Sequence, residues 1–133
     1  MQVKKCIFQQ HGDERGQLVA LEENREVPFK IKRVYYIFDT KEAVVRGKHA
    51  HKNLQQILIC VKGTCKIRLD DGKERITVIL NNPSEGLYVS SDIWREMYDF
   101  SKDAVLLVLA SELYDENDYI RDYEDFLRYV GEK

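Results

Sequence analysis

Two histidines, His49 and His51, stand two residues apart in the segment RGKHAHKNLQQILICVKG, which runs from Arg46 to Gly63. Side chains two positions apart in an extended strand point to the same face, so we expect both imidazoles to face the interior of a sheet. A single buried histidine is most often a satisfied core residue. Two on one face, each needing hydrogen-bonding partners, are more typical of metal binding or proton transfer.

The residues around the pair separate these two chemistries. The spacing from the pair through position 56 to Gly63 resembles the first motif of the cupins, in which metal-binding members have a glutamate where this chain has Gln56. A neutral amide is a poor ligand for a hard divalent cation beside two imidazoles. The metal-binding pattern also takes a histidine from a later motif, but the remaining histidine, His11, precedes the pair. We therefore expect neither a metal nor any other cofactor, with weak metal binding as the alternative.

Acid–base chemistry is the other interpretation of the pair. An imidazole has an unperturbed pKa of about 6.5, which suits proton transfer near neutrality. Arg33 and Tyr35 alternate on the segment IKRVYYIFD, and we expect them to share a face with the histidines if the strands pair. A phenol there would donate a hydrogen bond to a developing oxyanion, and an arginine would bind a phosphate. Two alternatives stay open: Tyr36 faces inward instead of Tyr35, and Arg33 is only a charge at an exposed barrel end.

The length and composition of the chain limit which class of protein it can be. The chain has 133 residues, of which 44% are apolar and 33% charged, with a net charge of −2. These values are typical of one soluble globular domain, which we expect over residues 1–133, and they give no support for a nucleic-acid-binding surface. The longest apolar run, Ala104 to Ala110, is too short for a membrane span. We see no signal peptide, and three cysteines without a C-x-x-C pair suit a cytoplasmic protein.

Short strand signals separated by turn residues follow one another along most of the chain. The clearest are Ile31 to Asp39, the histidine segment, and a hairpin around Asp71-Gly72. The period becomes helical only near the end, at Tyr119, Tyr123, Phe126, Leu127 and Val130. The sequence therefore predicts an all-β sandwich or barrel with a short C-terminal helix.

Several blocks, in order along nearly the whole chain, resemble the cupin-type 3,4-ketoisomerases that act on dTDP-4-keto-6-deoxyglucose. They are DERGQLVALEEN, PFKIKRVYYIFDT, RGKHAHK, QILICVKGTCKIRLDDG, GLYVSSDIWREMYDF and LASELYDENDYIRDYEDF. The resemblance implies a cupin jelly-roll barrel, a metal-independent isomerase and a homodimer. It also implies a cytoplasmic role in making deoxyamino sugars for surface glycans such as lipopolysaccharide and S-layer glycans. The product would be a dTDP-3-keto-6-deoxyhexose, formed through an enediol by histidine acid–base catalysis.

The same resemblance suggests a role for each candidate residue. His49 matches the family's base, while His51 and Tyr35 match residues that relay or donate protons. Arg33 and Arg46 match arginines that flank the pocket, and we expect them to contact the pyrophosphate or the sugar.

Three further residues are expected to bind substrate: Gln56, Arg15 and Arg95. The family varies at positions 15 and 95, and these differences go with the face of C4 that is reprotonated. Arg15 together with Arg95, in Trp94-Arg95-Glu96-Met97, mixes the two subtypes. We therefore leave the configuration of the product open and favour galacto weakly over gluco. As alternatives, Arg15 lies in a charged turn, and Arg95 pairs with Glu96 or Asp99 on the surface.

Other functions are compatible with the same scaffold. A cupin of this kind can bind a nucleotide sugar without converting it, or it can epimerise the sugar at C3 and C5. Incorporation of solvent deuterium into the sugar separates these possibilities. No residue of the sequence visibly reads the thymine base, and none marks the residues that cross a dimer interface.

Overall fold

The computed structural model describes residues 1–133 as twelve short strands, one 3-10 turn and one helix. The elements are β1 (Val3–Ile7), β2 (His11–Asp13), β3 (Gly16–Leu18), β4 (Arg33–Phe38), β5 (Arg46–His51), β6 (Gln56–Lys62), β7 (Cys65–Asp70), β8 (Arg75–Leu80), β9 (Glu85–Val89), β10 (Trp94–Tyr98), β11 (Val105–Ala110), η1 (Glu116–Asp118), β12 (Tyr119–Ile120) and α1 (Tyr123–Gly131). None of its helices has the length and apolar character needed to span a membrane.

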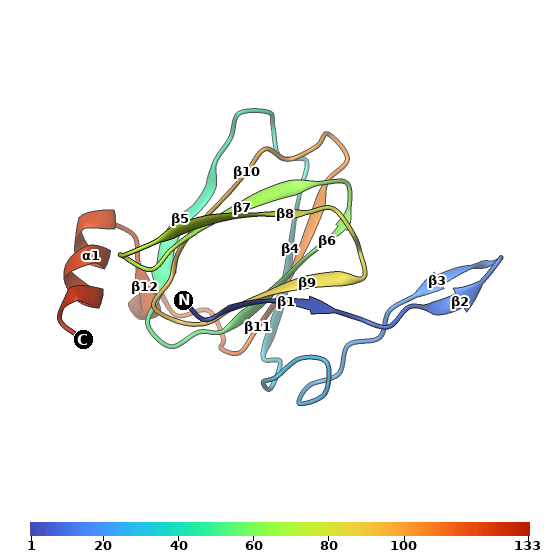
Figure 1. Ribbon diagram of the computed structural model, residues 1–133, viewed down its shortest axis with the longest axis horizontal. Coiled ribbons are helices and arrows are strands. Elements are labelled where there is room, and N and C mark those ends of the chain that lie inside the picture. The colour runs from blue at the N-terminus through green and yellow to red at the C-terminus, as the bar shows by residue number, and fades with distance from the viewer.

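Ten of these strands form two antiparallel sheets that enclose one interior. Their orders are β1-β9-β6-β11-β4 and β12-β5-β10-β7-β8. In Figure 1 strands β5, β7 and β8 lie above β1, β9 and β11, with the interior between them. Residues at alternate positions of each strand fill this interior, as period-2 alternation requires. The expected all-β barrel with a short C-terminal helix is confirmed.

The interior of the barrel is divided into an apolar part and a polar part. The apolar part contains fully buried residues such as Leu58, Ile67 and Leu106. The polar part contains four buried side chains: His49, His51, Gln56 and Arg95. Burial of so many polar groups is costly unless they find partners, so their contacts decide what this part of the barrel does.

The C-terminal helix starts later than its apolar period suggests. Asp122 caps α1, because its side chain accepts a hydrogen bond from the backbone N–H of Asp125. Phe126 is fully buried against Trp94 and Ile120. Tyr119, which continues the helical spacing in the sequence, lies instead in β12, where it pairs with His51 of β5.

The β2–β3 hairpin does not belong to the barrel. It projects away from the two sheets at the end opposite α1 (Figure 1), and all six of its strand residues are exposed. Strand β4 forms one edge of the first sheet, and its outward side chains Val34, Tyr36 and Phe38 are also exposed. An apolar stripe on a sheet edge is unusual for a surface that stays in water.

Candidate active site

The histidine pair lies on β5, and a bulge sets its direction. Residue 95 of β10 pairs with His49 and residue 96 with Gly47, so Lys48 is the extra residue. Gly47 and Lys48 both have positive φ, which is the backbone conformation that such a bulge needs. Both imidazoles are buried, with ring centroids 4.8 Å apart and planes at 83°. The structure thus brings the two rings together inside the barrel.

A cavity of about 310 Å³ opens beside His49. Its lining residues are Arg33, Tyr35, Ile37, Arg46, Gly47, His49, Met97, Tyr119 and Arg121. Tyr35 is the tyrosine that faces this cavity, whereas Tyr36 points outward and is 62% exposed. The open choice between the two tyrosines is therefore decided by the register of β4. His51 lies behind His49 and is fully buried.

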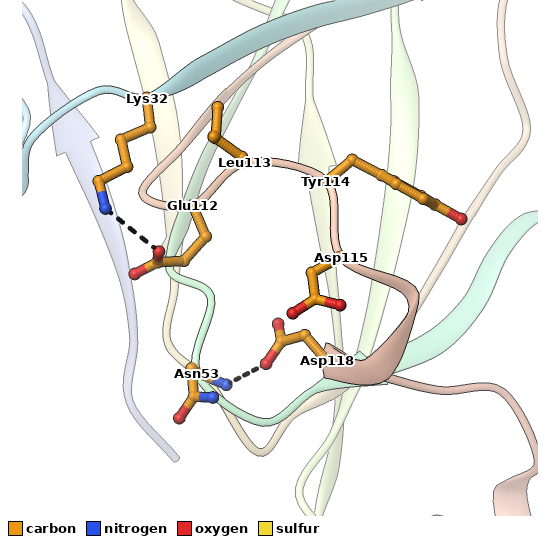
Figure 2. A pocket seen from close by; sticks show the side chains of 7 residues that line it. All are labelled: Lys32, Asn53, Glu112, Leu113, Tyr114, Asp115 and Asp118. Atoms are coloured by element: carbon orange, nitrogen blue, oxygen red, sulfur yellow. Dashed lines mark hydrogen bonds and ion pairs between the residues drawn. The ribbon is translucent and has the colours of Figure 1, made fainter.

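Asp118 was not among the residues that the sequence suggested, yet it holds His51. Its Oδ2 lies 3.2 Å from Nδ1 of His51, and its two oxygens accept hydrogen bonds from the backbone N–H groups of Asn53 and Leu54. Figure 2 shows Asp118 beside Asn53 in the wall of a neighbouring pocket. An ionised carboxylate only accepts, so Nδ1 of His51 carries the hydrogen. The other ring nitrogen, Nε2, then has a free lone pair and has no partner in the protein.

Arg95 is fully buried rather than on the surface. Its Nη1 donates to Oε1 of Gln56 at 2.5 Å, and its Nη2 donates to the carbonyl of Ile93 at 3.0 Å. It makes no ion pair with Glu96 or Asp99, since strand alternation on β10 turns residue 95 inward. The oxygen of Gln56, at the position of the cupin glutamate, is thus occupied by a cation. The described residues include no group of three or more side chains suited to hold a metal ion.

Burial and the positive charge of Arg95 act on both imidazoles in the same direction. They lower the pKa of His49 to about 4, and burial is the larger cause. They also hold the pKa of His51 far below its ordinary range. Burial raises the pKa of Tyr35. At neutral pH both histidines are therefore neutral and able to accept a proton, and the phenol keeps its hydrogen.

Three arginines surround the cavity. Arg33 lies with its guanidinium carbon 5.3 Å from the centre of the Tyr35 ring, and two of its buried nitrogens have no partner in the protein. Arg46 is exposed at the rim. Arg121, which the sequence did not suggest, stacks over Tyr119 at 4.3 Å and is held by Glu116. Three guanidinium groups at one opening suit a phosphate-bearing ligand.

Arg15 lies outside the barrel, whereas the other candidates line this cavity or are buried in the polar part of the barrel. It lies in the turn of the projecting β2–β3 hairpin, where its side chain is 86% exposed. Its partner is Asp13, two residues away, at 2.7 Å. Within a single chain Arg15 therefore lies in a charged turn, which is the alternative considered from the sequence.

The chain is similar to known proteins over nearly its whole length. Residues 1–131 match the family model described as FdtA: WxcM-like, C-terminal. The chain is 53% identical over 131 residues to a TDP-4-oxo-6-deoxy-alpha-D-glucose-3,4-oxoisomerase of Aneurinibacillus thermoaerophilus, covering 98% of this chain and 94% of the relative.

Two solved structures show the same likeness. One is a histidine-to-asparagine mutant of the 3,4-ketoisomerase QdtA from Thermoanaerobacterium thermosaccharolyticum in complex with TDP-4-keto-6-deoxyglucose. It has 45% identity, a TM-score of 0.96 and coverage of 98% and 95% of the two chains. The other is the WlaRB TDP-quinovose 3,4-ketoisomerase from Campylobacter jejuni, with 54% identity, a TM-score of 0.92 and coverage of 96% and 98%. The cupin fold and the isomerase activity expected from the sequence are thereby confirmed, and the chain belongs to the FdtA family of 3,4-ketoisomerases.

Proposed function

We propose that this protein converts dTDP-4-keto-6-deoxyglucose into a dTDP-3-keto-6-deoxyhexose, with His49 as the general base. One observation supports this most strongly. The neutral His49 ring lines the cavity beside Tyr35. The mutant 3,4-ketoisomerase with 45% identity has been solved in complex with TDP-4-keto-6-deoxyglucose.

The chemistry follows from the carbonyl group at C4 of the sugar, which acidifies the proton on C3. His49 takes that proton, and the electrons form an enediolate between C3 and C4. Tyr35 donates a hydrogen bond to the oxygen on which negative charge develops. Delivery of a proton to C4 and loss of the hydroxyl proton at C3 leave the ketone on C3. His51, held by Asp118, relays protons between these positions.

The arginines at the opening bind the pyrophosphate. Arg33 and Arg121 face the cavity from β4 and from the segment after β12, and Arg46 lies at the rim. Paired N–H donors of a guanidinium match phosphate oxygens in geometry and charge. The sugar then lies deeper, against His49 and Tyr35.

For the C4 configuration we propose galacto, on the basis of Arg15. Overall similarity points the other way, since a TDP-quinovose 3,4-ketoisomerase is 54% identical and a TDP-fucose-3,4-ketoisomerase is 40% identical, and quinovose has the gluco configuration.

A homodimer explains how Arg15 contributes to binding. The apolar stripe of Val34, Tyr36 and Phe38 lies on a free sheet edge, and the hairpin extends away from its own barrel. A second copy that covers the stripe would bring its hairpin, with Arg15, to this cavity. We place the reaction in the cytoplasm, where its keto product supplies an aminotransferase that serves surface-glycan synthesis.

NMR of the reaction in D₂O tests the function. Incubation with dTDP-4-keto-6-deoxyglucose is expected to give a 3-keto sugar with deuterium at C4, and the coupling between H4 and H5 in the product of a parallel reaction in H₂O reports galacto or gluco. Deuterium at C3 and C5 with the ketone still at C4 would instead indicate 3,5-epimerisation. Binding without exchange would indicate a binding protein. A chelator is expected to leave the rate unchanged, and a loss that added metal restores would contradict the metal-independent mechanism.

A further inference from the structure

A chain of hydrogen bonds crosses the polar part of the barrel from Arg95 to Tyr35. Nη1 of Arg95, on β10, donates to Oε1 of Gln56 at 2.5 Å. Nε2 of Gln56, at the start of β6, donates to the hydroxyl oxygen of Tyr35, on β4, at 2.9 Å. Tyr35 lines the cavity, whereas Gln56 does not. These hydrogen bonds therefore join a fully buried charge to a group that faces the cavity.

The direction of every hydrogen bond in this chain is forced. An arginine has no acceptor, so the amide oxygen of Gln56 must face Arg95. The amide nitrogen must then face Tyr35, and because it only donates, the phenol oxygen must accept. The hydroxyl hydrogen of Tyr35 is left without a protein acceptor and is available to the cavity. Tyr35 thus enters the reaction as a donor.

The charge at the far end of the chain strengthens this donor. Arg95 has no carboxylate within ion-pair distance, and it lies in a water-excluded interior where charges act strongly on their neighbours. A donor that is itself polarised by a cation stabilises a developing oxyanion more strongly than an isolated phenol does.

We propose that Gln56 is a positioning residue for the isomerisation: it orients the Tyr35 hydroxyl as a donor toward the enediolate oxygen and links it to the charge of Arg95. This inference rests on the proposed function and replaces the expected role of Gln56 as a substrate-binding residue. Its side chain is fully buried, and both of its polar atoms already have protein partners. It acts on the substrate only through Tyr35.

The substitution Gln56→Glu reverses the direction of the hydrogen bond between residue 56 and Tyr35 and still leaves Arg95 with a partner. A carboxylate only accepts, so it keeps Arg95 and draws the hydroxyl hydrogen of Tyr35 away from the cavity. We expect kcat to fall by about 10²-fold, the typical cost of one oxyanion donor, with KM unchanged. Assays contain a chelator, because glutamate at this position completes the cupin ligand pattern. The matched control is Gln55→Glu: Gln55 accepts from Tyr88, away from the cavity, and this variant is expected to keep the wild-type kcat.

A double-mutant cycle with Tyr35→Phe shows whether Gln56 works through the tyrosine. We expect the double variant to be no slower than Tyr35→Phe alone. Additive losses, or a raised KM with normal kcat in Gln56→Glu, would mean that Gln56 contacts the substrate itself and would overturn the proposal.

A second measurement does not depend on turnover. The pKa of the Tyr35 phenol is read by NMR of tyrosine labelled at Cζ, with Tyr35→Phe for assignment. The new anion in Gln56→Glu is expected to raise this pKa relative to wild type. An unchanged pKa of Tyr35 would refute the proposed link from Arg95 through Gln56 to Tyr35, whether or not the protein is an isomerase. Conversely, if the variant raises this pKa but the wild-type protein does not isomerise the nucleotide sugar, the link through Gln56 is supported and the proposed function is rejected.

Discussion

The polar cluster inside the barrel and the β2–β3 hairpin both contain residues that the sequence marked as candidates, but they hold them differently. Inside the barrel, His51 contacts Asp118 and Gln56 bonds to both Arg95 and Tyr35, all across long sequence separations. On the hairpin, Arg15 contacts only Asp13, in an exposed ion pair. The fold preorganises the first region, whereas in the second Arg15 has only a local, exposed partner within its own chain.

The energetics of the two regions differ accordingly. An exposed ion pair contributes about 0–1 kcal/mol, so Arg15 is free to exchange Asp13 for another partner. A buried polar group that loses its partner keeps its desolvation cost, which amounts to about 1–3 kcal/mol. Changes inside the barrel should therefore impair the chemistry, and changes on the hairpin should affect binding through a second subunit.

The largest effect is expected from His49→Asn. Loss of the general base should lower kcat by about 10²–10⁴-fold, while the similar shape keeps the fold. Steady-state kinetics with the nucleotide sugar measure this loss. The control is His11→Asn on the hairpin, where the imidazole is exposed and is expected to contribute nothing to kcat. Normal turnover in His49→Asn would reject this residue as the base.

A smaller loss, about 10²-fold in kcat, is expected from Asp118→Asn, because the wrong tautomer of His51 then becomes accessible. The two oxygens of Asp118 accept hydrogen bonds from the backbone N–H groups of Asn53 and Leu54. Whichever way the new asparagine is oriented, its NH₂ group replaces one of these acceptors, so one of the two hydrogen bonds is lost. Nitrogen NMR of His51 reports the tautomer directly. Asp115→Asn, which alters a cap on Asn117 in the same segment, is the control. An unchanged tautomer in Asp118→Asn would contradict the role of Asp118.

Arg15→Ala is expected to raise KM by about 10-fold with a small change in kcat, as for loss of one charge-assisted contact. If the contact crosses a dimer, mixing this variant with His49→Asn restores one complete site in each mixed dimer. Equilibrated equal amounts should then recover about a quarter of wild-type activity at low substrate. Activity no higher than the average of the two separate variants would mean that Arg15 does not serve a neighbouring subunit.

The smallest expected effect is on stability in acid. The pKa of His49 is about 4 in the folded protein and about 6.5 as an ordinary histidine. Between these values the unfolded chain binds a proton that the folded chain does not, so the free energy of unfolding falls as the pH falls. Urea denaturation across this window should show a shallower fall for His49→Asn than for His11→Asn. Equal slopes for the two variants would show that His49 is not held neutral by burial.

The sequence was enough to predict several features because they are local or repeated along the chain. Strand alternation predicted the all-β fold, and two histidines at strand spacing predicted a shared face for their rings. The ordered blocks from DERGQLVALEEN onward indicated the ketoisomerase family, because six matching segments are far more specific than one motif.

Other features depend on which distant residues the fold brings together. Asp118 lies 67 positions from His51, and no local period marks it. Strand alternation cannot tell Tyr35 from Tyr36 until the register of β4 is known, because a shift by one residue exchanges the two faces. The helical spacing of Tyr119 was misleading, since pairing with β5 outweighs a local period. Propensity and pattern act between neighbours in the chain, whereas the partner of a buried polar group is decided by packing between strands that are far apart in sequence.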